Sequence, residues 1–524
     1  MHGPRRAVYR VLVPLLLANS LPRLAYAANS GAVVLYASID RRPLSFTRLL
    51  KVLANKSDGE QDLSWERIKC LKDPSRHEAL AKICTFIIQP ETESCPVSID
   101  SICDLVNSIP AVEGGFEATC SRDVSLLRSG EIVQGNSTDG STTDPAFLYP
   151  STAELAADQK RLFDELDVGR AWRLVKNLRL PRREVTVAVL STGAATEYGD
   201  LAGEIISRYN AVSRDTENVS DINGHGTAML SIVDGIGNNR RYHESNKAKV
   251  KLFPVKVDTG VTESARLSDL LRGIDRIMQV GGVDVAIIPY VTESNKHTDM
   301  LFKQATRRLV DSGALVLVTT ADWNMRLDSY LVTPCHLAMN KLGMLCVAST
   351  TLEDPTKLYS SSKHSHYIPL AAPSSSVAAG AVRGEYYSSM RFRGGGAAVA
   401  LVGGAAALMS SIGSTKPDPY DVVRVLIHEA PRGVQDGDRQ LMDVNVTNIG
   451  RAVEAWLQLS LELQERQERA GKRVKKEAHV KQNKGMPRDV FDLDAIVLVK
   501  LCQLVCRHCV YYGTVDLVEI ISKL

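Results

Sequence analysis

The stretch Val185-Thr186-Val187-Ala188-Val189-Leu190-Ser191-Thr192-Gly193 decides the fold of the larger part of this 524-residue chain. Its first six residues are almost wholly apolar and rich in β-branched side chains. Such a run predicts a strand buried on both faces, as in a parallel sheet that lies between layers of helices. The polar Ser-Thr-Gly that follows marks the end of this strand.

Similar buried runs recur further along the chain, and helical patterns stand between them. The runs lie at residues 250–257, 283–288, 314–319 and 345–348. Alternating strands and helices are typical of an α/β fold with a parallel central sheet. We assign this fold to a domain of residues 158–458.

Two glycine-containing segments accompany the first strand. Gly224-His225-Gly226-Thr227 stands before an apolar helix, and Gly394-Gly395-Gly396 leads into the small apolar residues 402–408. Together with Ser191-Thr192-Gly193, and in this order, the segments resemble the subtilisin-like serine proteases over about residues 167–456. The resemblance implies the three-layer subtilisin-like fold and descent from a secreted serine endopeptidase.

Three positions of the family carry its peptide hydrolysis, and this chain retains one. In the family an aspartate orients a histidine, and the histidine removes the proton of an attacking serine. The resemblance assigns His225 to the histidine, Ser191 to the aspartate and Gly396 to the serine. A hydroxyl has no negative charge with which to support an imidazolium, and glycine has no side chain with which to attack. We therefore expect a catalytically inactive member, a pseudoprotease that acts as a binding scaffold or decoy.

Two further positions depart from the family pattern. The asparagine that helps to hold the oxyanion aligns with Asp322, or with Asn324 if the loop has shifted. The substrate-binding strand reads Pro289-Tyr290-Val291. Because proline lacks an N–H, we expect it to weaken the pairing of an extended peptide with this strand.

Two alternatives to the pseudoprotease remain open. Ser388-Ser389-Met390 imitates the family's Thr-Ser-Met, so Ser389 is the candidate for a displaced nucleophile in an active endopeptidase. This register inserts seven residues before the helix that normally follows the serine at once. The other alternative is a non-functional paralogue, or a chimaeric gene whose C-terminal tail does not belong to it.

The N-terminal part contains a predicted signal peptide and a small domain. Residues 1–27 combine arginines, an apolar stretch and the cleavage pattern Ala25-Tyr26-Ala27, so we expect secretion. Residues 28–128 alternate strand and helix patterns, which predicts a small α/β domain with a ferredoxin-like arrangement. The resemblance implies that this domain is the inhibitory propeptide, with residues 109–113 similar to its closing strand. A Ser/Thr/Gly-rich linker is expected at residues 129–157.

Two segments follow the large domain. Residues 459–492 are dense in Glu, Lys and Arg, which indicates a solvated helix or a disordered connector. Residues 493–524 form an apolar tail that Lys500, Arg507 and His508 interrupt, so we expect no transmembrane span. The cysteines of this tail do not have the spacing of a common zinc finger.

Ten cysteines and four glycosylation sequons suit an oxidising compartment. Cys335 and Cys346 are the only cysteines of the large domain, so we predict a disulfide between them. The cysteines before and after them form odd-numbered groups, which leaves their pairing open. The sequons are those at Asn55, Asn136, Asn218 and Asn445.

The composition limits the classes of partner that we expect for this chain. A formal net charge of +3 on 524 residues gives no basis for nucleic-acid binding. The expected partners are a polypeptide substrate or another protein, together with the chain's own propeptide-like domain. No cofactor or metal is expected from the sequence, although the resemblance allows for calcium, to which no residues can be assigned.

Overall fold

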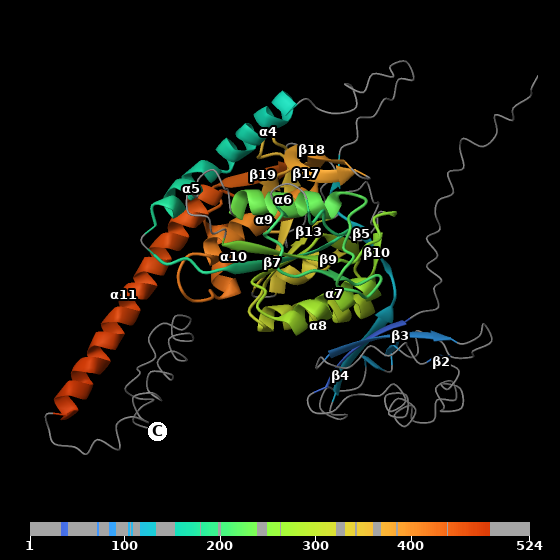
Figure 1. Ribbon diagram of the computed structural model, residues 1–524, viewed down its shortest axis with the longest axis horizontal. Coiled ribbons are helices and arrows are strands. Elements are labelled where there is room, and N and C mark those ends of the chain that lie inside the picture. Colours follow the sequence, from blue (N-terminus) through green and yellow to red (C-terminus); the bar gives the residue numbers. More distant parts are fainter. Residues whose placement is uncertain are drawn as a thin grey trace, which may run out of the picture. The chain divides into compact units, whose positions relative to one another are not determined.

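A computed structural model gives the architecture of the protein (Figure 1). The chain divides into two compact units, residues 1–457 and 458–524. The residues that the structure describes are 33–39, 71–72, 83–90, 103–104, 106–107, 116–132, 152–178, 180–197, 201–237, 249–262, 264–320, 331–340, 343–359, 368–383, 386–436 and 439–482.

The first unit is built on a nine-stranded sheet with the order β19-β20-β16-β15-β13-β11-β7-β9-β8. Neighbouring strands from β20 to β8 are parallel, and β19 is an antiparallel edge strand. The prediction of an α/β fold with a parallel central sheet is confirmed. The strands are β7 Val185–Ser191, β8 Tyr209–Asn210, β9 Val250–Lys256, β11 Val285–Ile288, β13 Leu315–Thr319, β15 Met344–Thr350, β16 Leu370–Pro373, β19 Arg432–Asp436 and β20 Arg439–Val446.

Helices cover both faces of this sheet, which makes three layers (Figure 1). Helices α6 His225–Gly237 and α9 Gly395–Ser410 pack on one face, and α7 Leu267–Val280 and α8 Lys296–Asp311 on the other. Helix α9 is buried along its whole length, because glycine and alanine let its backbone approach its neighbours closely. A Cβ at Gly403 would collide with Ile287, and one at Gly404 with Ile236.

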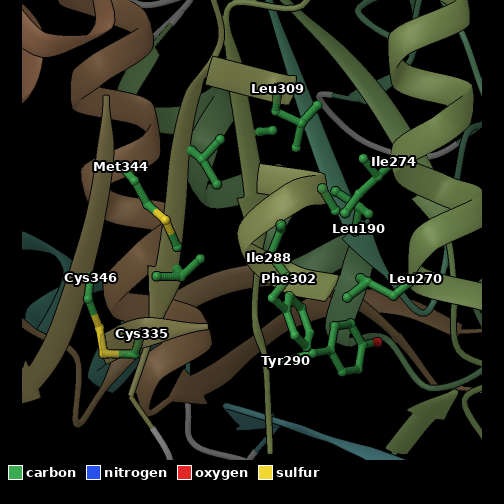
Figure 2. Close-up of a cluster of buried hydrophobic side chains, with 14 of the residues drawn as sticks. Leu190, Leu270, Ile274, Ile288, Tyr290, Phe302, Leu309, Cys335, Met344 and Cys346 are labelled. Carbon is green, nitrogen blue, oxygen red and sulfur yellow. A yellow bond between two sulfur atoms is a disulfide. The ribbon is translucent and has the colours of Figure 1, made fainter. Parts of the chain in front are cut away.

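The core on the other face joins α7 and α8 to the sheet (Figure 2). It is filled by large side chains that are almost completely excluded from solvent, so the burial of apolar area fixes both helices against the strands. Members of this cluster are Leu190, Leu270, Ile274, Ile288, Tyr290, Phe302 and Leu309.

The remaining elements of the first unit surround this framework. They are α4 Thr152–Glu165, α5 Val168–Lys176, β10 Ser264–Arg266, β12 Tyr290–Glu293, β14 Val332–Thr333, η4 Cys335–Asn340, β17 Val377–Arg383, β18 Tyr386–Arg393, α10 Pro419–His428 and the start of α11 Ile449–Gln482. In the second unit, residues 458–482 continue α11, so the described part of the predicted charged connector is helical. No helix among the described residues is long and apolar enough to cross a membrane.

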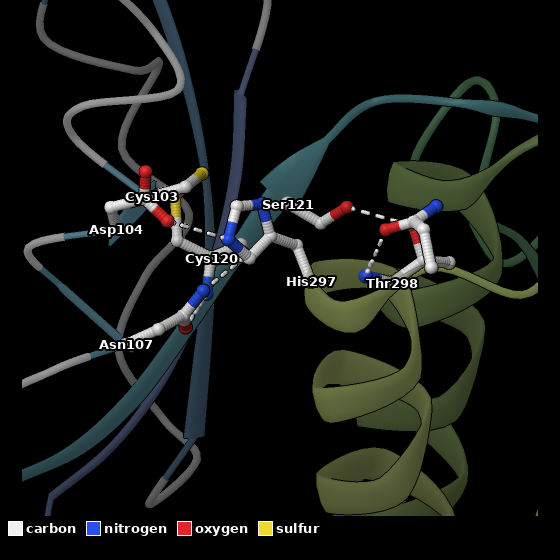
Figure 3. Close-up of a disulfide and its surroundings, with 8 residues drawn as sticks. Cys103, Asp104, Asn107, Cys120, Ser121, His297 and Thr298 are labelled. Carbon is white, nitrogen blue, oxygen red and sulfur yellow. Dashed lines mark hydrogen bonds and ion pairs between the residues drawn. A yellow bond between two sulfur atoms is a disulfide. The ribbon is translucent and has the colours of Figure 1, made fainter.

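The small N-terminal domain contains an antiparallel sheet of order β2-β3-β1-β4. Its strands are β1 Val33–Ile39, β2 Leu71–Lys72, β3 Ile83–Pro90 and β4 Phe116–Arg122. Polar contacts tie β4 and its surroundings to α8: Ser121 Oγ lies 3.1 Å from Thr298 Oγ1, and His297 Nε2 lies 2.9 Å from Asp104 Oδ1 (Figure 3). Residues 109–113, expected to form the closing strand, lie outside the described residues.

The chain does not become a linker at residue 129. After β4 it continues through β5 Ser125–Arg128 and β6 Glu131–Ile132, both of which pair with strands of the large domain. At the other end of the predicted linker, α4 already begins at Thr152. Linker composition alone could not reveal these ends, because the pairing partners of β5 and β6 lie more than a hundred residues away in sequence.

Two disulfides lie among the described residues. Cys335 is bonded to Cys346, as the sequence predicts, with a Cα–Cα distance of 5.2 Å. Cys103 is bonded to Cys120 in the small domain, with a Cα–Cα distance of 4.8 Å (Figure 3). The sequence does not select the second pair, because five cysteines precede the large domain and an odd number leaves the pairing open.

Both bonds should be present in protein produced in an oxidising compartment, and peptide mapping under non-reducing conditions should recover both linked peptides. The loops that they close are short, with sequence separations of 11 and 17. Replacing Cys335 and Cys346 together by serine should therefore lower the free energy of unfolding by about 2–3 kcal/mol, measured by urea denaturation. Recovery of Cys335 and Cys346 as alkylated free thiols from non-reduced protein would show this assignment to be wrong.

Candidate functional site

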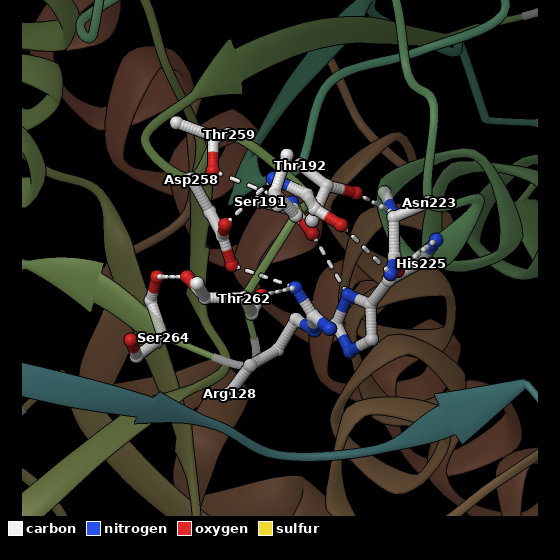
Figure 4. Close-up of polar contacts among 12 residues, drawn as sticks. Arg128, Ser191, Thr192, Asn223, His225, Asp258, Thr259, Thr262 and Ser264 are labelled. Carbon is white, nitrogen blue, oxygen red and sulfur yellow. Dashed lines mark hydrogen bonds and ion pairs between the residues drawn. The ribbon is translucent and has the colours of Figure 1, made fainter. Parts of the chain in front are cut away.

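The three residues aligned with the family's catalytic positions converge at one edge of the sheet. Ser191 is the last residue of β7, His225 the first of α6, and Gly396 the second of α9. All three are buried. Ser191 Oγ lies 2.8 Å from His225 Nδ1, and a Cβ built on Gly396 would lie 3.0 Å from His225 Nε2. The three residues are therefore brought together in space, and Figure 4 shows Ser191 beside His225.

Hydrogen bonds to Asp221 fix the loop that presents His225. The carboxylate of Asp221 accepts from the backbone N–H groups of Gly224 and Thr227, and from the hydroxyls of Thr192 and Thr227. These bonds tie the end of β7 to the start of α6. The Gly-His-Gly-Thr pattern is thus explained by loop geometry as well as by catalysis.

The segment 125–132 passes beside these residues, and we call the place that it fills between β10, β12 and β18 the cleft. Strand β5 lies between β10 and β12 and is antiparallel to both, with Leu127 opposite Ser264 and Val291. Strand β6 then pairs with β18, with Glu131 opposite Arg393. The peptide bond between Ser129 and Gly130, which joins the two strands, lies against Gly396 and His225.

The predicted substrate strand therefore pairs with an extended peptide, and that peptide belongs to the same chain. Tyr290 lies opposite Arg128, and the N–H of Ser129 donates to the carbonyl oxygen of Pro289 at 2.8 Å. The expected weakening by Pro289 does not arise at this contact, because the proline contributes its carbonyl oxygen and its missing N–H is not used.

The hydrogen bonds of His225 assign the positions of its hydrogens. Nε2 lies 2.8 Å from the carbonyl oxygen of Ser129, which can only accept, so Nε2 must carry the hydrogen. In the neutral ring Nδ1 is then an acceptor, and the Ser191 hydroxyl donates to it. The ring of Phe392 stands edge-on to the imidazole at 5.1 Å between centroids and holds its orientation.

Burial keeps His225 neutral. Loss of solvation and, to a smaller extent, the nearby positive charge of Arg128 lower the pKa of His225 to about 3, although the hydrogen bond to Ser129 acts in the opposite direction. The imidazole is therefore uncharged at physiological pH. Its Nε2, the atom that would have to remove a proton from a nucleophile, already holds one.

A buried ion pair anchors the segment beside the histidine. Arg128 Nη1 lies 2.7 Å from Asp258 Oδ2, and the two side chains are only 7% and 0% exposed. Asp258 also accepts from the N–H of Gly260 at 2.7 Å and from the Tyr290 hydroxyl at 3.2 Å. Burial raises the pKa of Asp258, and Arg128 and these hydrogen bonds act against that rise. Sequence reasoning missed this pair; its only local signal is an acidic residue directly after the buried run 250–257.

Other predicted site residues lie elsewhere or outside the described residues. Ser389 is on β18 opposite Gly380 and is exposed, whereas Phe392, three residues later on the same strand, faces His225. Since residues three apart on a strand point to opposite faces, Ser389 points away from the histidine. Asp322 and Asn324 lie outside the described residues.

Two of the four predicted glycosylation sequons lie among the residues that the structure describes, and these residues can also be searched for a metal site. Asn218 is exposed and Asn445 is half-buried on β20, while Asn55 and Asn136 lie outside the described residues. In the part of the chain that the structure describes, no group of three or more His, Cys, Asp or Glu side chains could hold a metal ion.

One known structure shares this architecture, and two others match it more weakly. Fervidolysin from Fervidobacterium pennivorans, a keratinolytic enzyme related to subtilisin, has a TM-score of 0.52 and 13% identity, over 81% of this chain and 61% of its own. A lanthipeptide protease has a TM-score of 0.45 and 17% identity, over 57% of this chain and 95% of its own. A cold-adapted subtilisin-like serine proteinase has a TM-score of 0.40 and 22% identity, over 50% and 88%. A comparison with curated proteins gave no match.

The sequence pattern of the Subtilase family matches residues 182–453. These residues make up more than half of the chain and extend from the start of β7 into α11. They include Ser191, His225 and Gly396, which the structure brings together. The chain therefore belongs to the Subtilase family.

Proposed function

We propose that this subtilase is a secreted, catalytically inactive protein that acts as a binding scaffold for a polypeptide or protein partner. The observation that carries the proposal is the contact between the Ser129 carbonyl oxygen and His225 Nε2, beside a glycine at the nucleophile position. Hydrolysis needs a nucleophile and a free base at this point. The chain places its own backbone at this point.

The orientation of the peptide bond also opposes catalysis. In productive catalysis the histidine faces the nucleophile's hydroxyl, while the carbonyl oxygen faces the donors of the oxyanion hole. Here the Ser129 carbonyl oxygen faces the imidazole, only 2.5 Å from the position that a Cβ at residue 396 would take. The carbonyl thus occupies the space that an attacking hydroxyl would need.

Secretion is supported by the predicted signal peptide of residues 1–27 and by the family, whose members are typically secreted. The two described disulfides suit the same oxidising compartment. The family acts on polypeptides, which favours a polypeptide or protein as the partner of an inactive member.

The alternative of an active endopeptidase with Ser389 as nucleophile has little support. Extended residues rise about 3.3 Å each, so three residues place Ser389 about 10 Å along β18 from Phe392. Its exposed side chain and its pairing with Gly380 keep it away from Nε2. A non-functional paralogue would be distinguished by the absence of secreted protein that carries residues 493–524.

The mature chain should not react with a fluorophosphonate probe and should not hydrolyse casein above the level of a His225→Ala control. Gly396→Ser alone should rescue little, because Ser191 cannot support an imidazolium; in subtilisin, loss of the aspartate alone costs on the order of 10⁴ in turnover. Ser389→Ala and Ser388→Ala form a matched pair. Labelling that Ser389→Ala abolishes and Ser388→Ala retains would establish the displaced nucleophile and refute inactivity.

The N-terminal domain should remain covalently attached after secretion. Without a nucleophile the chain cannot cut its own Ser129–Gly130 bond, so protein from a host without subtilisin-like proteases should start near Ala28. N-terminal sequencing and intact mass measure this directly. A homogeneous start at Gly130 that disappears in His225→Ala would demonstrate self-cleavage instead.

The free energy of unfolding should decrease as the pH falls, because His225 binds a proton less readily in the folded chain than in the unfolded chain. Its pKa is about 3 in the folded chain and about 6.5 when solvated, so the unfolded state binds the proton first as the pH falls. The free energy of unfolding should therefore decrease between pH 6.5 and 3, by up to about 1.4 kcal/mol per pH unit from this group. From about pH 7.5 upwards the histidine is almost fully deprotonated in both states and contributes almost no pH dependence.

His225→Gln is the matched control, because its amide can donate to Ser129 and accept from Ser191 but does not titrate. Urea denaturation of both proteins from pH 7.5 to 4 cancels the groups that they share. The stability of the parent relative to the variant should decrease as the pH falls. A difference that stays constant across this range would mean that His225 is not buried as described.

A further inference from the structure

Two consecutive residues in the first turn of helix α8 contact the small domain (Figure 3). His297 Nε2 lies 2.9 Å from Asp104 Oδ1, and Thr298 Oγ1 lies 3.1 Å from Ser121 Oγ. Asp104 and Ser121 come from different parts of the small domain, 17 residues apart in the sequence. Something must therefore keep these two residues at the spacing that the first turn of α8 requires.

A disulfide lies directly beside both contact residues. Asp104 follows Cys103 in the sequence, Ser121 follows Cys120, and the two cysteines are bonded to each other (Figure 3). We propose that this disulfide is a redox-sensitive switch for the contact with α8. In the oxidised state it holds Asp104 and Ser121 in place, and its reduction by a dithiol releases the small domain from α8 while the large domain stays folded. This switch is independent of whether the chain is catalytically active.

The disulfide is the covalent part of a connection that is otherwise made by neutral hydrogen bonds. Asn107 Nδ2 donates to the carbonyl oxygen of Cys120 at 3.0 Å, and Asn107 Oδ1 accepts from the N–H of Cys120 at 2.9 Å. These bonds join the residues around Cys103 to β4, but each contributes modestly in water. Because the disulfide restricts how far the two segments can separate, its loss greatly increases their freedom.

Helix α8 is held to the large domain without help from the small domain. Its apolar residues Leu301, Phe302 and Leu309 belong to the buried core cluster against the sheet. Asn295 Oδ1 accepts from the N–H of Thr298 and caps the start of the helix. The contacts with the small domain are made by hydroxyl, carboxylate and imidazole groups, for which water offers alternative partners. Release of the small domain therefore leaves α8 packed and capped.

Burial makes reduction depend on opening. Cys103 and Cys120 are 1% and 0% exposed, and a dithiol must reach a sulfur atom to react. One thiolate of the reagent attacks one sulfur and breaks the S–S bond, and the second thiol of the reagent then displaces the sulfur that was attacked. Two electrons and two protons pass to the protein, which gains two thiols, while the reagent becomes a disulfide. Reduction thus follows opening of the contact, and loss of the bond then keeps it open.

Weakening the contact from the α8 side should accelerate reduction of the disulfide. Gln304 also lies on α8 and accepts from the hydroxyl of Thr119 on β4. The full-length oxidised protein is treated with dithiothreitol and iodoacetamide, and alkylation of Cys103 and Cys120 is followed by mass spectrometry. His297→Ala and Gln304→Ala should each raise the rate by about two- to fivefold, and together by about tenfold.

Lys296→Ala is the matched control, because Lys296 is exposed on the same turn of α8 as His297. This variant should react at the rate of the parent. The Cys335–Cys346 disulfide lies within the core of the large domain and is an internal reference in every sample, since its reduction should not be accelerated by His297→Ala or Gln304→Ala. Equal rates in the parent and in both α8 variants would overturn the proposal. Reduction of both disulfides at one common rate would also overturn it, because the bond would then open only when the large domain unfolds.

Hydrogen exchange measures the release itself. It compares the oxidised parent with protein whose Cys103–Cys120 bond has been reduced and alkylated, and with the double variant Cys103→Ser and Cys120→Ser if that variant folds. The amides in the first turn of α8 should exchange about fivefold faster or more without the bond, while those of β7 and α9 should not change. Unchanged exchange at the start of α8 would overturn the proposal. Faster exchange in β7 and α9 as well would also overturn it, because the large domain would then depend on this disulfide.

Discussion

The close packing of helix α9 through the centre of the first unit is the constraint on which the rest depends. Every residue of this helix is buried, and it can lie against the sheet and α6 because its surface is made of glycine, alanine and small apolar side chains. The position of α9 determines where the N-terminus of this helix lies relative to the carboxyl end of β7. Gly396 and His225 are therefore brought together by packing, whatever chemistry their side chains can perform.

This explains how the framework can form with serine at position 191 and glycine at position 396. The hydrogen bonds of Asp221 order the loop before α6, and glycines permit the close approach of that loop to β7. A Cβ at Gly226, for example, would collide with the carbonyl of Gly193. None of these requirements involves the nucleophile, so they are met with serine at position 191 and glycine at position 396.

The sequence predicted the features that depend on local pattern. Buried strands and the glycine-rich helix are apparent because residue size and hydrophobicity vary with a short period, and His225 and Ser191 could be placed from the motifs around them. The occupation of the cleft could not be predicted, because Ser129 contacts residues about 96 and 191 positions away. Its surroundings are rich in Ser, Gly and Thr, and the local pattern therefore indicated a linker. The Arg128–Asp258 pair was missed for the same reason, since neither residue is unusual in its own segment.

The occupied cleft also limits how the protein could bind a partner. A polypeptide in trans would compete with a segment that is tethered to the same chain, whose effective concentration is on the order of millimolar for short flexible linkers and higher for an ordered connection. It would also have to supply an arginine to Asp258 or leave a buried carboxylate unpaired. Both the competition with the tethered segment and the need for an arginine argue against a general decoy that captures substrates of active relatives in this cleft. A scaffold role consequently places the partner surface outside the cleft, and the internal segment then contributes by joining the small domain to the large one through β5 and β6.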